Sequence, residues 1–185
     1  MSEQTTTQTA PAAKPKRPKA KSMIMIGEQT QALFDSARQA KERGEKVGWS
    51  ASIFPQEIAE TLGLVVLYPE NHSAGIAARH QADPFLQECE GALGYSNDLC
   101  AYAKVNLAYA SVLNGESQVD LPDNGKMVRP DFLLLTNNIC NQLTKWYENL
   151  AKQLNIPIFF IDTCYNPWDY VTETRVRYVR AQIDQ

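Results

Sequence analysis

The sequence predicts an α/β fold, in which an open parallel sheet carries helices on both of its faces. Residues 64–68, 132–135 and 156–161 are short apolar runs rich in branched and aromatic side chains, as buried parallel strands are. Between these runs lie segments whose apolar residues recur at helical spacing. Regular alternation of strand and helix is typical of a parallel sheet in a three-layer, Rossmann or flavodoxin-like arrangement.

The sequence of residues 46–68 predicts one strand-helix-strand unit, preceded by a helix. A helix over residues 28–43 ends at Gly44, a good C-capping residue, and a short strand over residues 46–49 follows. A second helix, residues 56–62, opens after a proline and leads to the strand at residues 64–68. Apolar spacing and capping residues predict the remaining helices at residues 73–80, 84–93, 98–113, 139–154 and 168–183.

Composition indicates one domain and excludes several classes of protein. The chain has 185 residues and 44% hydrophobic content, enough for a single core, which we place at residues 23–185. No apolar stretch approaches the ~20 residues that a membrane helix needs, and the N-terminus lacks a secretory apolar centre. We therefore expect a cytoplasmic protein without a membrane partner.

Residues 1–22 differ from the rest of the chain. They combine Thr, Gln, Ala, Pro, Lys and Arg without apolar periodicity, so we expect a disordered basic tail. The tail carries five cationic side chains and one glutamate, a net charge of +4, which leaves about −7 on the remaining chain from a total of −3. An acidic body is unsuited to gripping nucleic acid, and a tail of this kind is more often a solubilising extension than a docking segment.

The chain contains four cysteines, at positions 89, 100, 140 and 164. They could pair as disulfides, but a chain that is neither short nor secreted favours reduced thiols or metal ligands. For any single cysteine, burial in the core is the more common role. Cys89, inside an amphipathic helix, keeps that interpretation, while Cys164 follows a strand and is intermediate.

Polar residues follow four predicted strands. Because parallel strands end at one edge of a sheet, we expect the segments after them to meet there. These segments are residues 50–52, 68–72, 136–140 and 162–165. Cys140 lies in one of them, and Cys100 lies in the first turn of the predicted helix 98–113, where the helix dipole favours a thiolate and an anionic cluster.

Alternative roles remain for other residues at this edge. Ser52 and Glu70 could each cap the helix that follows. For each residue the sequence favours capping and a functional role equally. Residues 146, 147 and 150 stand at helical spacing and are most simply core. The sequence has no glycine-rich phosphate loop and no Gly-x-Ser-x-Gly elbow, so binding of ATP or NAD and hydrolase chemistry have no support.

Four segments resemble the 2-hydroxyacyl-CoA dehydratases and their relatives, the ATP-dependent benzoyl-CoA reductases. The most specific pieces are Asp-Leu-Cys at residues 98–100 and Asn-Asn-Ile-Cys at residues 137–140. The match is closest to the cluster-bearing subunit of the dehydratases, over its N-terminal portion. The matching segments are residues 47–57, 67–71, 94–103 and 137–149.

The resemblance implies a 4Fe-4S cluster held by three cysteines, with one iron open to the substrate. Cys100 and Cys140 match two of these ligands, and Ser52 and Glu70 match positions that face the substrate, as hydrogen-bonding or proton-handling residues. The implied partners are a second, related cluster-bearing subunit, an iron-sulfur activator protein that hydrolyses ATP, and a CoA thioester. One electron added to the thioester carbonyl gives a ketyl radical that can expel the α-hydroxyl, after which the β-hydrogen becomes acidic.

One feature departs from the family pattern. Family members continue into a second domain that supplies the third cysteine, whereas this sequence stops at Gln185. It could be the N-terminal portion of a longer protein, the remainder could be on another polypeptide, or the activity could be lost. Cys164 or Cys89 is a less favoured source of the third ligand.

The resemblance therefore favours a 2-hydroxyacyl-CoA dehydratase subunit over two alternatives. The first alternative is a subunit of a benzoyl-CoA reductase, which would use the same open cluster and the same electron supply on an aromatic acyl-CoA. The second is a non-catalytic scaffold or assembly subunit, in which the cysteines are structural.

Overall fold

Four short strands form one sheet in the computed structural model, which describes residues 20–121 and 125–184. The sheet order is β2-β1-β3-β4, and every neighbouring pair is parallel. The strands are β1 (Val47–Ser50), β2 (Val65–Leu67), β3 (Phe132–Thr136) and β4 (Ile158–Ile161). The predicted α/β fold with a parallel sheet, including the first strand-helix-strand unit, is confirmed.

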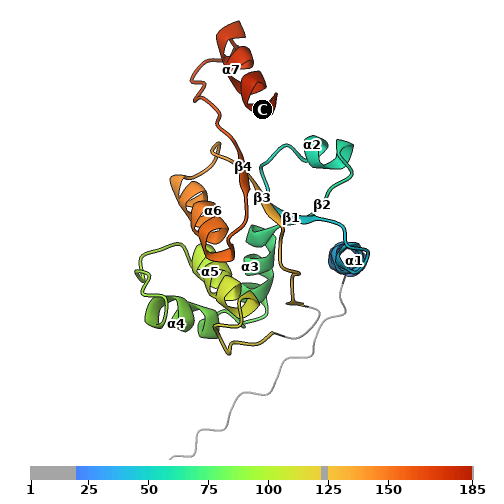
Figure 1. Ribbon diagram of the computed structural model, residues 1–185, viewed down its shortest axis with the longest axis vertical. Helices are drawn as coiled ribbons and strands as arrows, with labels where there is room; N and C mark the ends of the chain where they lie inside the picture. The colour runs from blue at the N-terminus through green and yellow to red at the C-terminus, as the bar shows by residue number, and fades with distance from the viewer. Residues whose placement is uncertain (1–19, 122–124, 185) are drawn as a thin grey trace, which may run out of the picture.

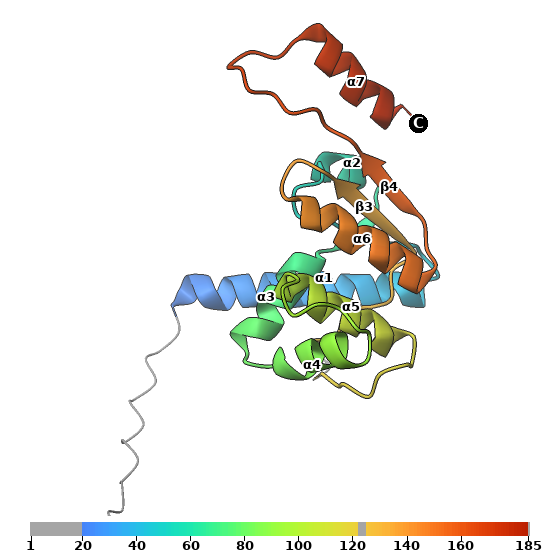
Figure 2. The same cartoon turned by 90° about the vertical axis from the view of Figure 1, so that its left-hand side faces the viewer.

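Helices cover both faces of the sheet (Figures 1 and 2). In both views α6 lies on one side of the strands, whereas α1 and α2 lie on the other. The central helix α5 packs against α3, α4 and α6 and buries nine consecutive residues. The helices of the described ranges are α1 (Lys21–Glu42), α2 (Gln56–Thr61), α3 (Pro69–Ala78), α4 (Asp83–Gly91), α5 (Ala101–Leu113), α6 (Asn141–Leu154) and α7 (Glu173–Ile183). None of them combines the length and apolarity that a membrane crossing requires.

Several helices begin at other residues than the sequence predicts. α3 begins four residues earlier, because Pro69 fits the first helical position directly after β2. α5 begins three residues later, because Cys100 has a non-helical backbone (φ −48°, ψ 126°) and occupies the N-cap. α7 begins at Glu173 rather than at residue 168, because the side chain of Thr172 accepts the Arg175 N–H and caps the helix there.

The predicted basic tail falls mainly on residues 1–19, which lie outside the described residues. Its last two residues, Lys21 and Ser22, are the first residues of α1. This helix starts without a capping side chain and exposes four consecutive apolar residues, Met23 to Ile26. Neither a cap nor an apolar stripe marks its true start in the sequence.

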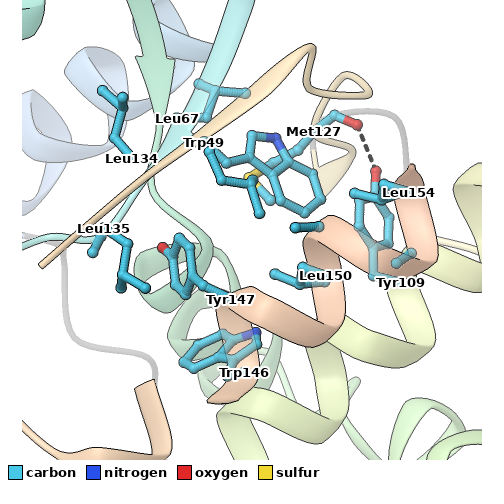
Figure 3. Close-up of a cluster of buried hydrophobic side chains, with 14 of the residues drawn as sticks. Trp49, Leu67, Tyr109, Met127, Leu134, Leu135, Trp146, Tyr147, Leu150 and Leu154 are labelled. Carbon is cyan, nitrogen blue, oxygen red and sulfur yellow. Dashed lines mark hydrogen bonds between the residues drawn. The ribbon is translucent and has the colours of Figure 1, made fainter. Parts of the chain in front are cut away.

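The core lies between the sheet and helices α5 and α6 (Figure 3). Trp49 of β1 stacks on Tyr109 of α5, with ring centroids 6.3 Å apart. Their polar atoms are satisfied by backbone carbonyls, since the Trp49 indole donates to Val128 O (3.1 Å) and the Tyr109 hydroxyl to Met127 O (2.7 Å). Residues 146, 147 and 150 are all buried in this core, as their spacing predicts.

His72 of α3 is a buried titratable group, 3% exposed, whose ring centroid lies 4.7 Å from that of Tyr109. Its Nε2 lies 2.8 Å from Gly125 O, and its Nδ1 has no partner among the described residues. Burial is the main cause that lowers the pKa of His72 to about 4; the positive charge of Arg79 lowers it further, and the bond to Gly125 opposes the shift. The imidazole is therefore neutral in the folded protein at neutral pH.

Mild acid is expected to destabilise the protein through His72. The unfolded chain binds this proton below about pH 6.5 and the folded chain only near pH 4, so stability is lost as the pH falls between these values. From pH 7 to pH 5 we expect a loss of about 2 kcal/mol from this group. Urea unfolding at both pH values measures it. The loss should shrink in His72→Gln and persist in His80→Gln, an exposed histidine; equal losses in both variants would refute the assignment.

Candidate functional site at the carboxyl edge of the sheet

The sheet order places a topological switch point between β1 and β3. The chain leaves β1 toward β2 on one side and leaves β3 toward β4 on the other. In open α/β sheets of this order, ligands bind in the crevice outside the carboxyl ends of the two strands at such a point. The segments that follow these strands, residues 51–55 and 137–140, contain Ser52 and Cys140.

The structure brings Ser52 and Glu70 together. The Ser52 backbone N–H donates to Glu70 Oε1 (3.0 Å), and the Tyr147 hydroxyl donates to Glu70 Oε2 (2.9 Å). Both carboxylate oxygens therefore accept a hydrogen bond, one from the loop after β1 and one from α6. The Ser52 side chain is exposed and Glu70 is half-buried, so both remain accessible at this edge.

The alternative capping roles of these two residues are wrong. Pro55 is the N-cap of α2, and no side chain caps that helix. Glu70 lies inside the first turn of α3, which also has no side-chain cap, and its carboxylate instead bonds to Ser52 and Tyr147. Their predicted hydrogen-bonding or proton-handling role stays a prediction, which the shared geometry supports.

Cys100 and Cys140 occupy equivalent positions, at the N-caps of α5 and α6. The two helices run in the same direction: Tyr95 before α5 bonds Asn149 of α6 (3.2 Å), and Asn114 after α5 bonds Gln153 O (3.1 Å) near the end of α6. Both cysteines therefore lie at the same end of the helix pair. A helix N-terminus carries a partial positive charge, which suits an anionic group bound at this end of the helix pair.

A buried lysine fixes the loop that carries Cys100. Lys104 is 5% exposed, and its ammonium lies 2.5 Å from Glu90 Oε1 and 3.0 Å from Asn97 O. Its backbone N–H donates to Cys100 O in the first turn of α5. Lys104 thus contacts α4, the loop before Cys100 and the first turn of α5 at the same time.

The other two cysteines lie in different surroundings. Cys89 is buried in α4, and burial raises the pKa of its thiol to about 11, which fits the predicted core role. Cys164 is exposed and lines an open groove of about 410 Å³ beside α7. All four cysteines are free thiols, as expected for reduced residues.

The residues fit an iron-sulfur cluster in part. Two accessible thiols at parallel helix N-termini suit an anionic, thiolate-bound cluster. Within residues 20–121 and 125–184, no group of three or more His, Cys, Asp or Glu side chains is placed to hold a metal ion. Cys89 is buried in α4 and Cys164 lies beside α7.

The sequence predictions missed two residues of this edge. The Asn137 side chain accepts the backbone N–H (2.8 Å) and the hydroxyl (2.7 Å) of Thr163 and donates to Asp162, so it joins the segments after β3 and β4. Tyr147 is fully buried, as its core spacing predicts, yet its hydroxyl bonds to Glu70. The signal available for Tyr147 is that a buried phenol needs a hydrogen-bond partner.

Comparisons with known proteins agree with these motifs. The family model described as 2-hydroxyglutaryl-CoA dehydratase, D-component, matches residues 51–185. The chain is 50% identical over 159 residues to the (R)-phenyllactyl-CoA dehydratase alpha subunit of Clostridium sporogenes, covering 86% of this chain and 37% of that protein. It is 45% identical over 170 residues to the (R)-2-hydroxyisocaproyl-CoA dehydratase alpha subunit of Clostridioides difficile, covering 90% and 39%.

A more distant relative is one of the subunits of the benzoyl-CoA reductase of Thauera aromatica, 26% identical over 170 residues, with 90% of this chain and 38% of that protein covered. The chain thus spans well under half the length of these three relatives. The family match covers most of the chain, and the resemblance seen in the motifs is confirmed. This chain belongs to the family of the 2-hydroxyglutaryl-CoA dehydratase D-component.

Proposed function

We propose that this chain is the N-terminal portion of a cluster-bearing subunit of a 2-hydroxyacyl-CoA dehydratase, which removes water from its substrate by ketyl radical chemistry after ATP-driven one-electron activation. The observation that carries the proposal is the arrangement of Ser52, Glu70, Cys100 and Cys140: one pair meets at the carboxyl edge of the sheet, and the other begins two parallel helices. The two dehydratase relatives are 50% and 45% identical to this chain, whereas the benzoyl-CoA reductase subunit is 26% identical. The higher identities favour dehydration over ring reduction.

Cys100 and Cys140 would hold a 4Fe-4S cluster together with a ligand from outside the described residues. When bound, a cluster with an open iron supplies an electron and a Lewis acid for the thioester. The proposed partners are a second related cluster-bearing subunit, an ATP-hydrolysing iron-sulfur activator and the CoA thioester. The relatives are named alpha subunits, which supports the presence of a partner chain.

The remaining residues would bind the substrate and handle protons. Ser52 presents an exposed side chain next to Glu70, so its hydroxyl can donate to a substrate oxygen. The Glu70 carboxylate, held at both oxygens, retains lone pairs that can accept a proton from a substrate carbon or return one to a leaving hydroxyl.

An activity assay on the native assembly tests the proposal. The assembly, purified without oxygen, is incubated with activator and ATP and either (R)-2-hydroxyisocaproyl-CoA, (R)-phenyllactyl-CoA or benzoyl-CoA. We expect ATP-dependent formation of the corresponding 2-enoyl-CoA from at least one hydroxyacyl thioester. Turnover of benzoyl-CoA alone would replace the proposal with the reductase, and no turnover of any of the three in an assembly without iron would favour a scaffold.

A further inference from the structure

Tyr147 carries a hydroxyl into the core, where its ring packs among apolar side chains. Its side chain is fully buried on α6, and Figure 3 shows the ring inside the cluster, with the hydroxyl directed away from Leu150. The partner of this hydroxyl is Glu70 Oε2, at 2.9 Å, from a residue 77 positions away. The bond therefore links the interior of the domain to the carboxyl edge of the sheet.

Packing alone does not account for this hydroxyl. A phenylalanine would fill the same space without the cost of burying a polar atom, which is considerable when the atom lacks a partner. The bond from Tyr147 to Glu70 thus has a use beyond filling the core.

The bond completes the fixation of the Glu70 carboxylate. A single donor lets a carboxylate rotate about its last side-chain bond, whereas donors on both oxygens define its plane. The Ser52 N–H holds Oε1 and the Tyr147 hydroxyl holds Oε2. Burial, followed by the negative charge of Glu70, raises the pKa of Tyr147 well above its ordinary value, so the phenol remains a donor under working conditions.

We propose that Tyr147 is a positioning residue: its buried hydroxyl orients the Glu70 carboxylate so that the free lone pairs face the substrate edge. This inference rests on the proposed function, which gives Glu70 contact with the substrate. The tyrosine itself touches no substrate, because its side chain is fully enclosed.

The test compares Tyr147→Phe with Tyr109→Phe in the native assembly. Both changes remove one hydroxyl from a buried ring, but the Tyr109 hydroxyl bonds to the Met127 carbonyl and not to Glu70. Infrared difference spectra of protein labelled with ¹³C-glutamate report the Glu70 carboxylate stretch, which is assigned as the band lost in Glu70→Gln. Steady-state kinetics with the hydroxyacyl-CoA that the wild-type assembly dehydrates give kcat and KM separately.

In Tyr147→Phe we expect a shifted Glu70 band and a kcat lowered about tenfold or more with KM little changed, because a charged hydrogen bond is lost without loss of contact with the substrate. Tyr109→Phe should leave the band in place. An unshifted band in Tyr147→Phe, or an equal fall in kcat in both variants, overturns the inference. A different result is full activity in Glu70→Gln together with a shifted Glu70 band in Tyr147→Phe. In that case the positioning bond stands and the proton-handling role of Glu70 fails.

A second measurement covers the case in which Tyr147→Phe does not fold. With 3-fluorotyrosine incorporated in place of tyrosine, the ¹⁹F resonance of residue 147 reports the same bond from its donor side. We expect this resonance to move in Glu70→Gln and to stay in place in Glu57→Gln, an exposed glutamate on α2. A resonance that does not respond to Glu70→Gln overturns the inference equally.

Discussion

Serine in place of Cys100 or of Cys140 is expected to strip iron and acid-labile sulfide from the anaerobically isolated assembly and to lower dehydration at least about a hundredfold. Changes that only perturb the surroundings of a metal ligand already cost about 10- to 100-fold, and loss of the ligand itself should cost more. The two residues occupy equivalent N-cap positions on α5 and α6, so we expect the two variants to behave alike.

Cys164→Ser is the matched control, because Cys164 is exposed like Cys140 but lies beside α7. It should retain the wild-type iron content of about four per cluster. Circular dichroism verifies that each variant is folded. Unchanged iron in either N-cap variant would exclude that cysteine as a ligand, and unchanged iron in both would favour the structural interpretation of the cysteines.

Gly48→Ala should lower the free energy of unfolding by about 3 kcal/mol, near the upper end for overpacking of a core. A Cβ at Gly48 would stand 2.3 Å from the Phe132 ring, which lies across the strand pair β1 and β3. The ring cannot swing freely, since it is 8% exposed and packs edge-on against Phe159. Chemical denaturation of the purified protein measures the loss.

Two further variants separate this clash from the general effect of glycine. Gly27→Ala, at a helical position with no atom within 4 Å of the new Cβ, should stabilise by about 0.5–1 kcal/mol. Combining Gly48→Ala with Phe132→Leu should recover part of the loss, because the ring that causes the clash is gone. Additive losses in the double variant would show that the contact with Phe132 is not the cause.

Local signals predicted most of the fold and the surroundings of the cysteines. The apolar runs predict the strands β2, β3 and β4, of which β2 and β3 are largely buried, whereas β4 at the edge of the sheet exposes Phe159 and Phe160. Parallel strands bring their following segments to one edge. Cys100 and Cys140 fall at helix starts for the same local reason. The predicted start of α3 at residue 73 is wrong, because a proline directly after a strand also suits a first helical turn, and the helix begins at Pro69.

The hydrogen bonds of the site could not be predicted in the same way. The Glu70–Tyr147 bond joins residues 77 positions apart, and the Asn137–Thr163 bond joins different strand ends. Periodicity places a side chain on a face of its own element, but it carries no information about which distant polar atom that side chain meets. Tyr147 shows the helical spacing of a core residue whether or not its hydroxyl has a partner.

Ser52 holds Glu70 through its main chain, and its side chain stands exposed beside that contact. At position 52 the main chain therefore anchors Glu70, and the side chain takes no part in that bond. Any residue with a peptide N–H supplies the anchor, so the side chain there can change while the carboxylate keeps its place. Under the proposed function, single substitutions at this position, proline excepted, would alter substrate preference without displacing the Glu70 carboxylate.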